Sequence, residues 1–184
     1  SSVENNYGGG IEAGVGGATA VDPTAAPVDN LTTNSPFTYQ INRMQFGEYF
    51  YTDRLFRILG QPSDLEGLWG VRTPNEDRLR KEADVFSVRA KEDLEVYVAY
   101  DGGASALPSW LDPSASGYAE VAGDEVTTTN PTTPTYKLYK QSFSAGDTIT
   151  FGGNLASATN VTSTYGSCAE TLPVNPLAPS GEHT

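Results

Sequence analysis

The sequence predicts an all-β protein: an antiparallel, jelly-roll-like β-sandwich with an extended, strand-forming arm at its N-terminus. Between residues 37 and 151, short stretches of alternating apolar and polar residues recur between Gly, Pro and Asp. The helical candidate at 76–83 has only Leu79 and Ala83 as apolar residues, too few for a buried stripe. The first 21 residues also alternate, although they are rich in glycine.

The expected strands are rich in β-branched and aromatic residues, the types that favour extended structure. They are expected near residues 37–41, 49–51, 55–58, 65–71, 85–88, 94–100, 136–139 and 148–151. The stretch at 94–100 has two distinct faces, with Leu94, Val96, Val98 and Tyr100 on one and Glu95, Tyr97 and Ala99 on the other. Trp69, between Leu68 and Val71, is expected in the core.

The charges divide the chain into a body and two flanks. Its 184 residues carry 11 basic and 23 acidic side chains, a net charge of −12, and every base lies between Arg43 and Lys140. We therefore expect an arm at 1–21, a proline-rich linker at 22–36, the sandwich at 37–166 and an extended tail at 167–184. This charge disfavours nucleic acid as a partner, and no apolar run is long enough for a membrane span. The single Cys168 argues against a disulfide framework.

The arm has the period of a strand with one buried face. Its larger apolar side chains fall on odd positions, whereas the even positions hold mainly glycine, alanine and polar residues. The arm could fold back on its own sandwich, or it could enter the sheet of a neighbouring copy as a donor strand. Insertion into a neighbour is a heterologous contact, which builds an open filament. The expected interface residues are Tyr7, Ile11, Ala13, Val15 and Val21.

Several motifs within the body carry a resemblance. They read VYVAYDGGA at 96–104, LPSWL at 107–111, YKLY at 136–139 and FSAGDTITFGGN at 143–154, with YFYTDR at 49–54 and VRTPNED at 71–77 upstream. In this order they resemble a secreted bacterial β-sandwich module often attached to polysaccharide-degrading enzymes. The resemblance covers roughly Tyr39 to Asn154 and implies a sandwich fold and carbohydrate binding. Family members often carry an Arg where this chain has Gly102 and Gly103.

The arrangement of arm, linker and sandwich carries a second resemblance, to subunits of secreted, glycosylated bacterial filaments. Asn30 and Asn160 each begin an Asn-x-Thr sequon, so we expect both as acceptors if the chain is exported. This resemblance and the Gly-, Ser- and Thr-rich composition favour an extracellular or cell-surface location.

Exposed aromatic rings would be needed to stack on sugars. Trp110 is the leading candidate for such a platform, with Tyr100 and Tyr118 beside it, although Trp110 could equally belong to the core. Acidic pairs at 76–77, 92–93 and 124–125 could bind Ca²⁺ through oxygen ligands, and solvated loop carboxylates are the simpler interpretation. No other cofactor and no catalytic residue is predicted.

These observations favour a structural subunit of an extracellular filament, assembled through insertion of its arm into a neighbouring copy. The alternative is a carbohydrate-binding module of a secreted polysaccharide-degrading system. A hydrolase or lyase is the least favoured class, because acidic pairs occur by chance in any acidic protein.

Overall fold

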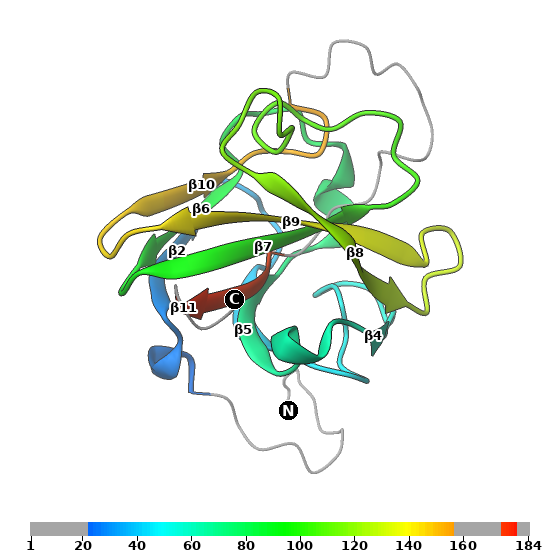
Figure 1. Ribbon diagram of the computed structural model, residues 1–184, viewed down its shortest axis with the longest axis horizontal. Coiled ribbons are helices and arrows are strands. Elements are labelled where there is room, and N and C mark those ends of the chain that lie inside the picture. Colours follow the sequence, from blue (N-terminus) through cyan, green and yellow to red (C-terminus); the bar gives the residue numbers. More distant parts are fainter. Residues whose placement is uncertain (1–21, 157–173, 180–184) are drawn as a thin grey trace.

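The computed structural model describes residues 22–156 and a separate strand at 174–179. Two antiparallel sheets pack against each other, one with seven strands in the order β3-β5-β11-β7-β9-β8-β4 and one with three in the order β10-β6-β2 (Figure 1). The strands are β2 (Val28–Thr33), β3 (Gln40–Met44), β4 (Ile58–Gly60), β5 (Leu68–Arg72), β6 (Phe86–Ala90), β7 (Leu94–Asp101), β8 (Ala119–Thr128), β9 (Thr135–Phe143), β10 (Thr148–Phe151) and β11 (Val174–Pro179).

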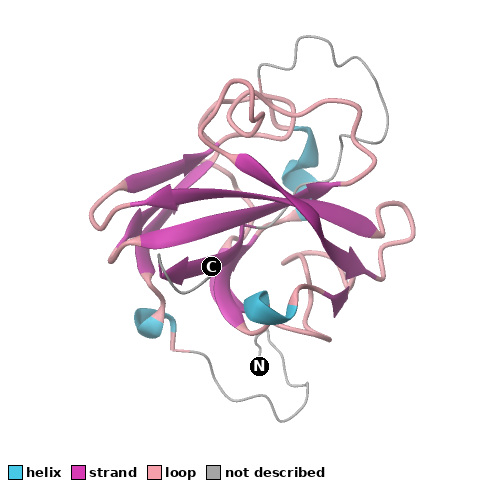
Figure 2. Cartoon of the chain, viewed as in Figure 1, coloured by secondary structure: helices cyan, strands magenta, loops and turns pink. Residues whose placement is uncertain are grey.

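Helical structure in the described residues is confined to three short 3₁₀ turns, η1 (Pro23–Ala25), η2 (Ser63–Leu65) and η3 (Asn75–Leu79) (Figure 2). The all-β prediction is therefore confirmed. The charged stretch at 76–83 contributes only η3, because it lacks an apolar stripe that a longer helix could bury. None of the helical turns in the described residues is long and apolar enough to cross a membrane.

The two faces predicted for the 94–100 stretch are present in β7, and each of them lies in a core of its own. Val96 and Val98 belong to the core between the two sheets, which also contains Trp69. Tyr97 and Ala99 belong to a second core on the opposite face of the large sheet, which the chain between β3 and β5 covers. Both faces of β7 are therefore buried, and the strand lies deep in the molecule.

The predicted linker at 22–36 requires a correction, because part of it is a strand. Residues 28–33 form β2, which pairs antiparallel with β6 at the edge of the small sheet. Val28 is fully buried, and the Arg89 guanidinium holds the Asp29 carboxylate in a two-pronged ion pair, with N–O distances of 3.0 and 2.7 Å. The sandwich thus begins at Val28 rather than at residue 37.

The predicted extended tail at 167–184 is corrected in the same way. Residues 174–179 form β11, which lies inside the large sheet between β5 and β7 (Figure 1). The arm at 1–21, with its interface candidates Tyr7, Ile11, Ala13, Val15 and Val21, lies outside the described residues, as do Asn160 and Cys168.

Candidate functional sites

The motif residues around Trp110 contact the Gly152-Gly153-Asn154 segment, and we call this set of contacts the structural lock. The Trp110 indole Nε1–H donates to the Gly153 carbonyl oxygen at 2.9 Å, and the Tyr100 hydroxyl donates to the Asn154 carbonyl oxygen at 3.0 Å. A Cβ atom at Gly152 would lie 2.6 Å from Trp110 Cδ1. The motif therefore ties the end of β7 and the 107–111 turn to the chain after β10, and its glycines allow this close approach.

The predicted sugar platform requires a correction for the same reason. Tyr100 is 0% exposed and Tyr118 is 5% exposed, so neither presents a ring face to a ligand. Trp110 packs edge to face against Tyr118 and Phe151, with ring centroids 6.1 and 6.0 Å apart. Trp110 is half-buried and packs against the main core. Tyr100 and Tyr118 thus belong to the core, and Trp110 lies against it.

The sequon at Asn30 is accessible in the described part of the chain. Asn30 and Thr32 are both exposed on β2, the edge strand of the small sheet. Asn30 has a φ of 57°, in the left-handed region, and the pairing of β2 with β6 shifts register beside it. This local departure from regular pairing suits Asn, which adopts the left-handed conformation more readily than most residues.

The acidic pair at 76–77 is engaged by protein groups. The Tyr39 hydroxyl donates to buried Asp77 at 2.6 Å, and Arg80 lies 3.4 Å from the same carboxylate. Burial, together with the Asp77 hydrogen bond, raises the pKa of Tyr39 well above its usual range. The Glu76 carboxylate pairs with Arg54 at 2.6 Å. Among the described residues, no three His, Cys, Asp or Glu side chains gather as a metal site would require.

A pocket of about 200 Å³ lies at the C-terminal end of β7. Its walls are Asp101, Gly102, Gly103, Glu125, Thr132, Thr133, Pro134, Thr135 and Lys137. The strand registers bring these walls together, because Lys137 pairs with Tyr100 on one side and with Glu125 on the other. Its lining residues include two acids, one lysine and three threonines, and none of them is aromatic. Asp101 Oδ1 accepts a hydrogen bond from the Gly103 amide at 2.8 Å.

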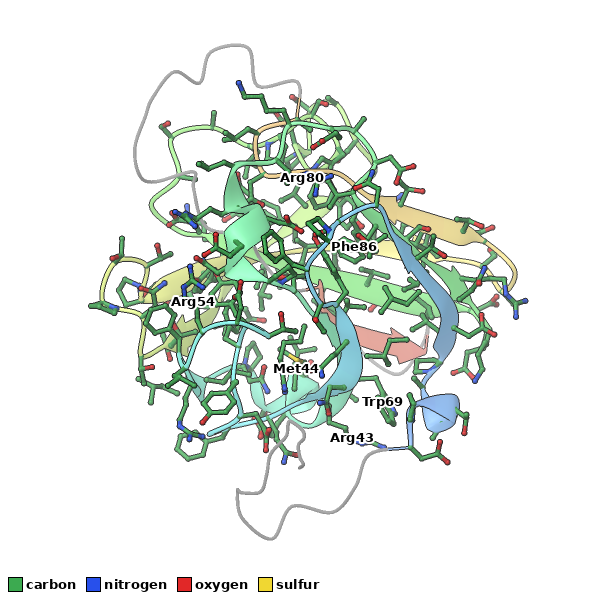
Figure 3. All side chains as sticks on the ribbon, turned by 180° about the vertical axis from the view of Figure 1, so that it is seen from behind. Arg43, Met44, Arg54, Trp69, Arg80 and Phe86 are labelled. Atoms are coloured by element: carbon green, nitrogen blue, oxygen red, sulfur yellow. The ribbon has the colours of Figure 1, made fainter. Side chains whose placement is uncertain are left out.

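A second feature is a slot between β5 and β7, which β11 fills. β11 runs antiparallel to both neighbours, so β5 and β7 run parallel to each other. Val174 lies between Val71 and Val98, and Leu177 lies between Trp69 and Val96. Figure 3 shows Trp69 at the β5 side of this slot with the Arg43 guanidinium over its ring, 4.4 Å from the ring centroid. Without β11 the large sheet would consist of two separate halves.

The slot continues past the first residue of β11 to Arg72, at the end of β5. Arg72 is 6% exposed, and its Nε and Nη2 have no hydrogen-bond partner within 22–156 and 174–179. Glu48 Oε1 lies 3.7 Å from Nη2, too far for a hydrogen bond. Burial lowers the pKa of Arg72 to about 10, and Glu48 offsets only part of that shift. This end of the slot therefore contains a buried cation with incomplete neutralisation.

Sequence reasoning identified neither the pocket nor the slot. The pocket walls come from the end of β7 and the glycines after it, from β8, and from β9 with the loop before it, and nothing in the sequence indicates that these segments meet. The slot depends on β5 and β7 lying one strand apart, although residues 73–93 separate them in the chain. The Gly102-Gly103 pair was the one usable signal, because it departs from the Arg that the resemblance implies.

No family model matches this chain, and no curated protein matches it. Among solved structures, the chain is similar in fold to part of a β-glucuronidase from glycoside hydrolase family 2, with a TM-score of 0.68 and 19% identity over 82% of this chain and 14% of that one. It is also similar to part of a family 138 glycoside hydrolase that targets pectin rhamnogalacturonan II, with a TM-score of 0.51 and 14% identity over 87% of this chain and 18% of that one. The chain therefore spans less than a fifth of either enzyme, and the two similarities show that its β-sandwich fold also occurs within these two glycoside hydrolases.

Proposed function

We propose that this chain is a non-catalytic carbohydrate-binding module that holds a neutral sugar in the pocket at the end of β7. The observation that carries the proposal is the gathering of Asp101, Glu125, Lys137 and threonine hydroxyls around one depression. Carboxylates and hydroxyls accept hydrogen bonds from sugar hydroxyls, and the ammonium group donates them. The fold similarity to parts of two carbohydrate-active enzymes supports the same class of ligand.

The charge of the pocket restricts the kind of sugar. The lining contains two acids and one lysine, so the carboxylate of a uronic acid would be repelled by a net negative charge, whereas a neutral sugar would not. The volume of about 200 Å³ is below that of ordinary drug-sized pockets, which fits one sugar residue better than a long oligosaccharide. Gly102 and Gly103 leave this wall free of larger side chains.

The test is affinity electrophoresis of the protein through gels that contain neutral or acidic polysaccharides. We expect a neutral polysaccharide to retard the protein, and we expect Glu125→Ala and Lys137→Ala each to weaken that retardation roughly tenfold by removing a hydrogen bond to a charged group. Glu92→Ala is the matched control, since Glu92 is an exposed acid before the opposite end of β7. If no neutral polysaccharide binds, or if all three variants bind as the parent does, the proposal is wrong.

We propose as a second function that the chain is the subunit of an extracellular filament, in which one copy donates a strand to the next. The observation in favour is the placement of β11, a segment far from β5 and β7 in the chain that completes the middle of their sheet. A sheet whose central strand comes from a distant part of the chain is the kind of sheet to which a strand of another copy can be added.

Removal of residues 1–21 tests this second function. We expect the full chain to form polymers by light scattering and electron microscopy, and the truncated chain to remain monomeric. The truncation leaves η1 and β2 intact, so circular dichroism should show an unchanged β-sheet spectrum as the folding control. Polymers formed equally well by the truncated chain would exclude the arm as the connector.

A further inference from the structure

We propose that the β5–β7 slot of one copy accepts residues 8–16 of the N-terminal arm of a second copy, in place of β11, and that Glu12 of the arm neutralises Arg72. This inference rests on the second proposed function and specifies its binding site.

β11 is an incomplete occupant of the slot. It has six residues against the eight of β7, and two of them, Pro176 and Pro179, have no amide hydrogen to donate to a neighbour. Its register shifts between Val174 and Leu177, so three steps along β11 cover two steps along β5 and β7. The arm contains no proline before Pro23, so all its amides could pair.

One face of the slot is apolar, and the other contains a glycine and an arginine. The odd and even positions of the arm differ in a matching way. On one face, Trp69, Val71, Val96 and Val98 line the main core. Strand alternation places Gly70 and Arg72 of β5 on the other face, together with Tyr97 and Ala99 of β7. The odd positions Ile11, Ala13 and Val15 suit the first face. The even positions Gly10, Glu12 and Gly14 suit the second, where only Glu12 carries a long side chain.

This assignment fixes a register. If the arm runs in the direction of β11 and Glu12 lies beside Arg72, then Ala13 lies between Val71 and Val98. Val15 then lies between Trp69 and Val96, with a spacing of two residues on all three strands, so no register shift is needed. Glu12 would supply the carboxylate that the buried guanidinium lacks, a charge-assisted pairing that is stronger than a neutral hydrogen bond.

The number of candidate strands favours a second copy as the source of the arm. The described residues contain one such slot, and the chain carries two segments that suit it. β11 fills the slot of its own chain, which leaves the arm for a neighbour. In the proposed assembly the arm displaces β11 from the neighbour's slot, and the contact is heterologous, so repetition produces an open filament.

Disulfide trapping between two separately made variants tests the site and the register, in a Cys168→Ser background. One copy carries Ala13→Cys and the other Val98→Cys, because directly opposed strand residues lie within the Cα separation of a disulfide. We expect an interchain disulfide in the mixture. Ala20→Cys paired with Val98→Cys is the control, since the register places Ala20 seven residues away from the matching position.

Different outcomes of this experiment test the β5–β7 slot and filament formation separately. Polymers without the Ala13–Val98 disulfide, or with equal trapping at Ala20, would overturn the slot and leave filament formation standing. A disulfide that forms only within a chain carrying both cysteines would show that the arm fills its own slot, which also overturns the inference. Failure of the parent chain to polymerise would overturn the second proposed function and the inference together.

The proposed pairing of Glu12 with Arg72 is tested by a separate measurement. We expect Glu12→Gln to weaken chain association about tenfold, measured by the concentration at which polymers appear, because it removes the carboxylate opposite Arg72. Glu4→Gln, in the same arm but beyond residues 8–16, should leave that concentration unchanged. Equal effects of the two variants would exclude a specific role for Glu12. Glu12→Arg combined with Arg72→Glu should recover part of the loss if the exchanged pair still folds.

Discussion

At the scale of single residues, the aromatic and glycine motif has a structural role that its composition conceals. Trp110 donates a hydrogen bond to the Gly153 carbonyl and Tyr100 donates one to the Asn154 carbonyl, and Gly152 leaves room for the Trp110 ring. A tryptophan in a turn between a serine and a leucine is compatible with sugar stacking or with core packing. The choice depended on whether residues 107–111 meet the chain after β10, a contact that no local pattern reveals.

Replacement of Gly152 tests this lock. A Cβ atom there would lie 2.6 Å from Trp110 Cδ1 and 3.0 Å from the Ala83 carbonyl oxygen, so we expect Gly152→Ala to lower the free energy of unfolding by about 1–3 kcal/mol. The measurement is urea denaturation followed by tryptophan fluorescence. Gly103→Ala is the control, because its Cβ would lie 3.4 Å from Asp101 Oδ1, an ordinary contact, and should change stability by less than about 0.5 kcal/mol. Equal costs for the two substitutions would contradict the lock.

At the scale of elements, the strands with clear alternation were predicted from the sequence, and two strands without it were missed. The stretches near 68–72, 86–90 and 94–101 are strands as their alternation predicts. β2 was missed because three prolines between residues 22 and 36 suggested a linker, yet they flank the strand and leave 28–33 free to pair. β11 was missed because its two prolines argue against a central strand.

The two missed elements share a physical cause. Each is held by a partner distant in sequence: β2 pairs with β6, and β11 pairs with β5 and β7. Asp29 gains its ion pair only because the register places it opposite Arg89. Local propensity was weak in both segments, so tertiary pairing determined the outcome.

At the scale of the whole molecule, burial of several tyrosines links stability to alkaline pH. Desolvation raises the pKa values of Tyr39, Tyr97, Tyr118 and Tyr139 above their ordinary value of 10.0. Each therefore loses its proton more readily in the unfolded chain. Their contribution is fully present below pH 10.0 and is lost as pH rises toward the folded-state pKa values. Arg72, whose pKa is lowered to about 10, acts in the opposite direction as a single group against four.

We therefore expect the urea midpoint to fall above pH 10.0, with tyrosinate absorbance rising together with unfolding. Tyr118→Phe is the informative variant, because the Tyr118 hydroxyl is buried without a hydrogen-bond partner in the described residues. It should be neutral or slightly stabilising at neutral pH, since it removes an unsatisfied polar atom, and its alkaline loss should be shallower. A midpoint that is insensitive to alkaline pH in both proteins would contradict this account.

The sequence by itself determined the all-β class, most of the strands and the two-faced character of β7. These properties follow from side-chain alternation, which is local and can be counted along the chain. It also separated the mixed-charge body from acidic flanks, although it placed the boundary nine residues late, at Phe37 instead of Val28.

Only the tertiary structure decided which segments became neighbours, and the candidate sites depend on that decision. The pocket at the end of β7, the lock around Trp110 and the β5–β7 slot each combine segments that are separated in the chain. Arg72 appears in the sequence as an ordinary basic residue of a strand. In the fold, Arg72 is buried beside an incompletely filled slot, and two of its guanidinium nitrogens have no hydrogen-bond partner in the described residues. The free-energy cost of removing a charge from water depends on its surroundings in space and not on its neighbours in sequence.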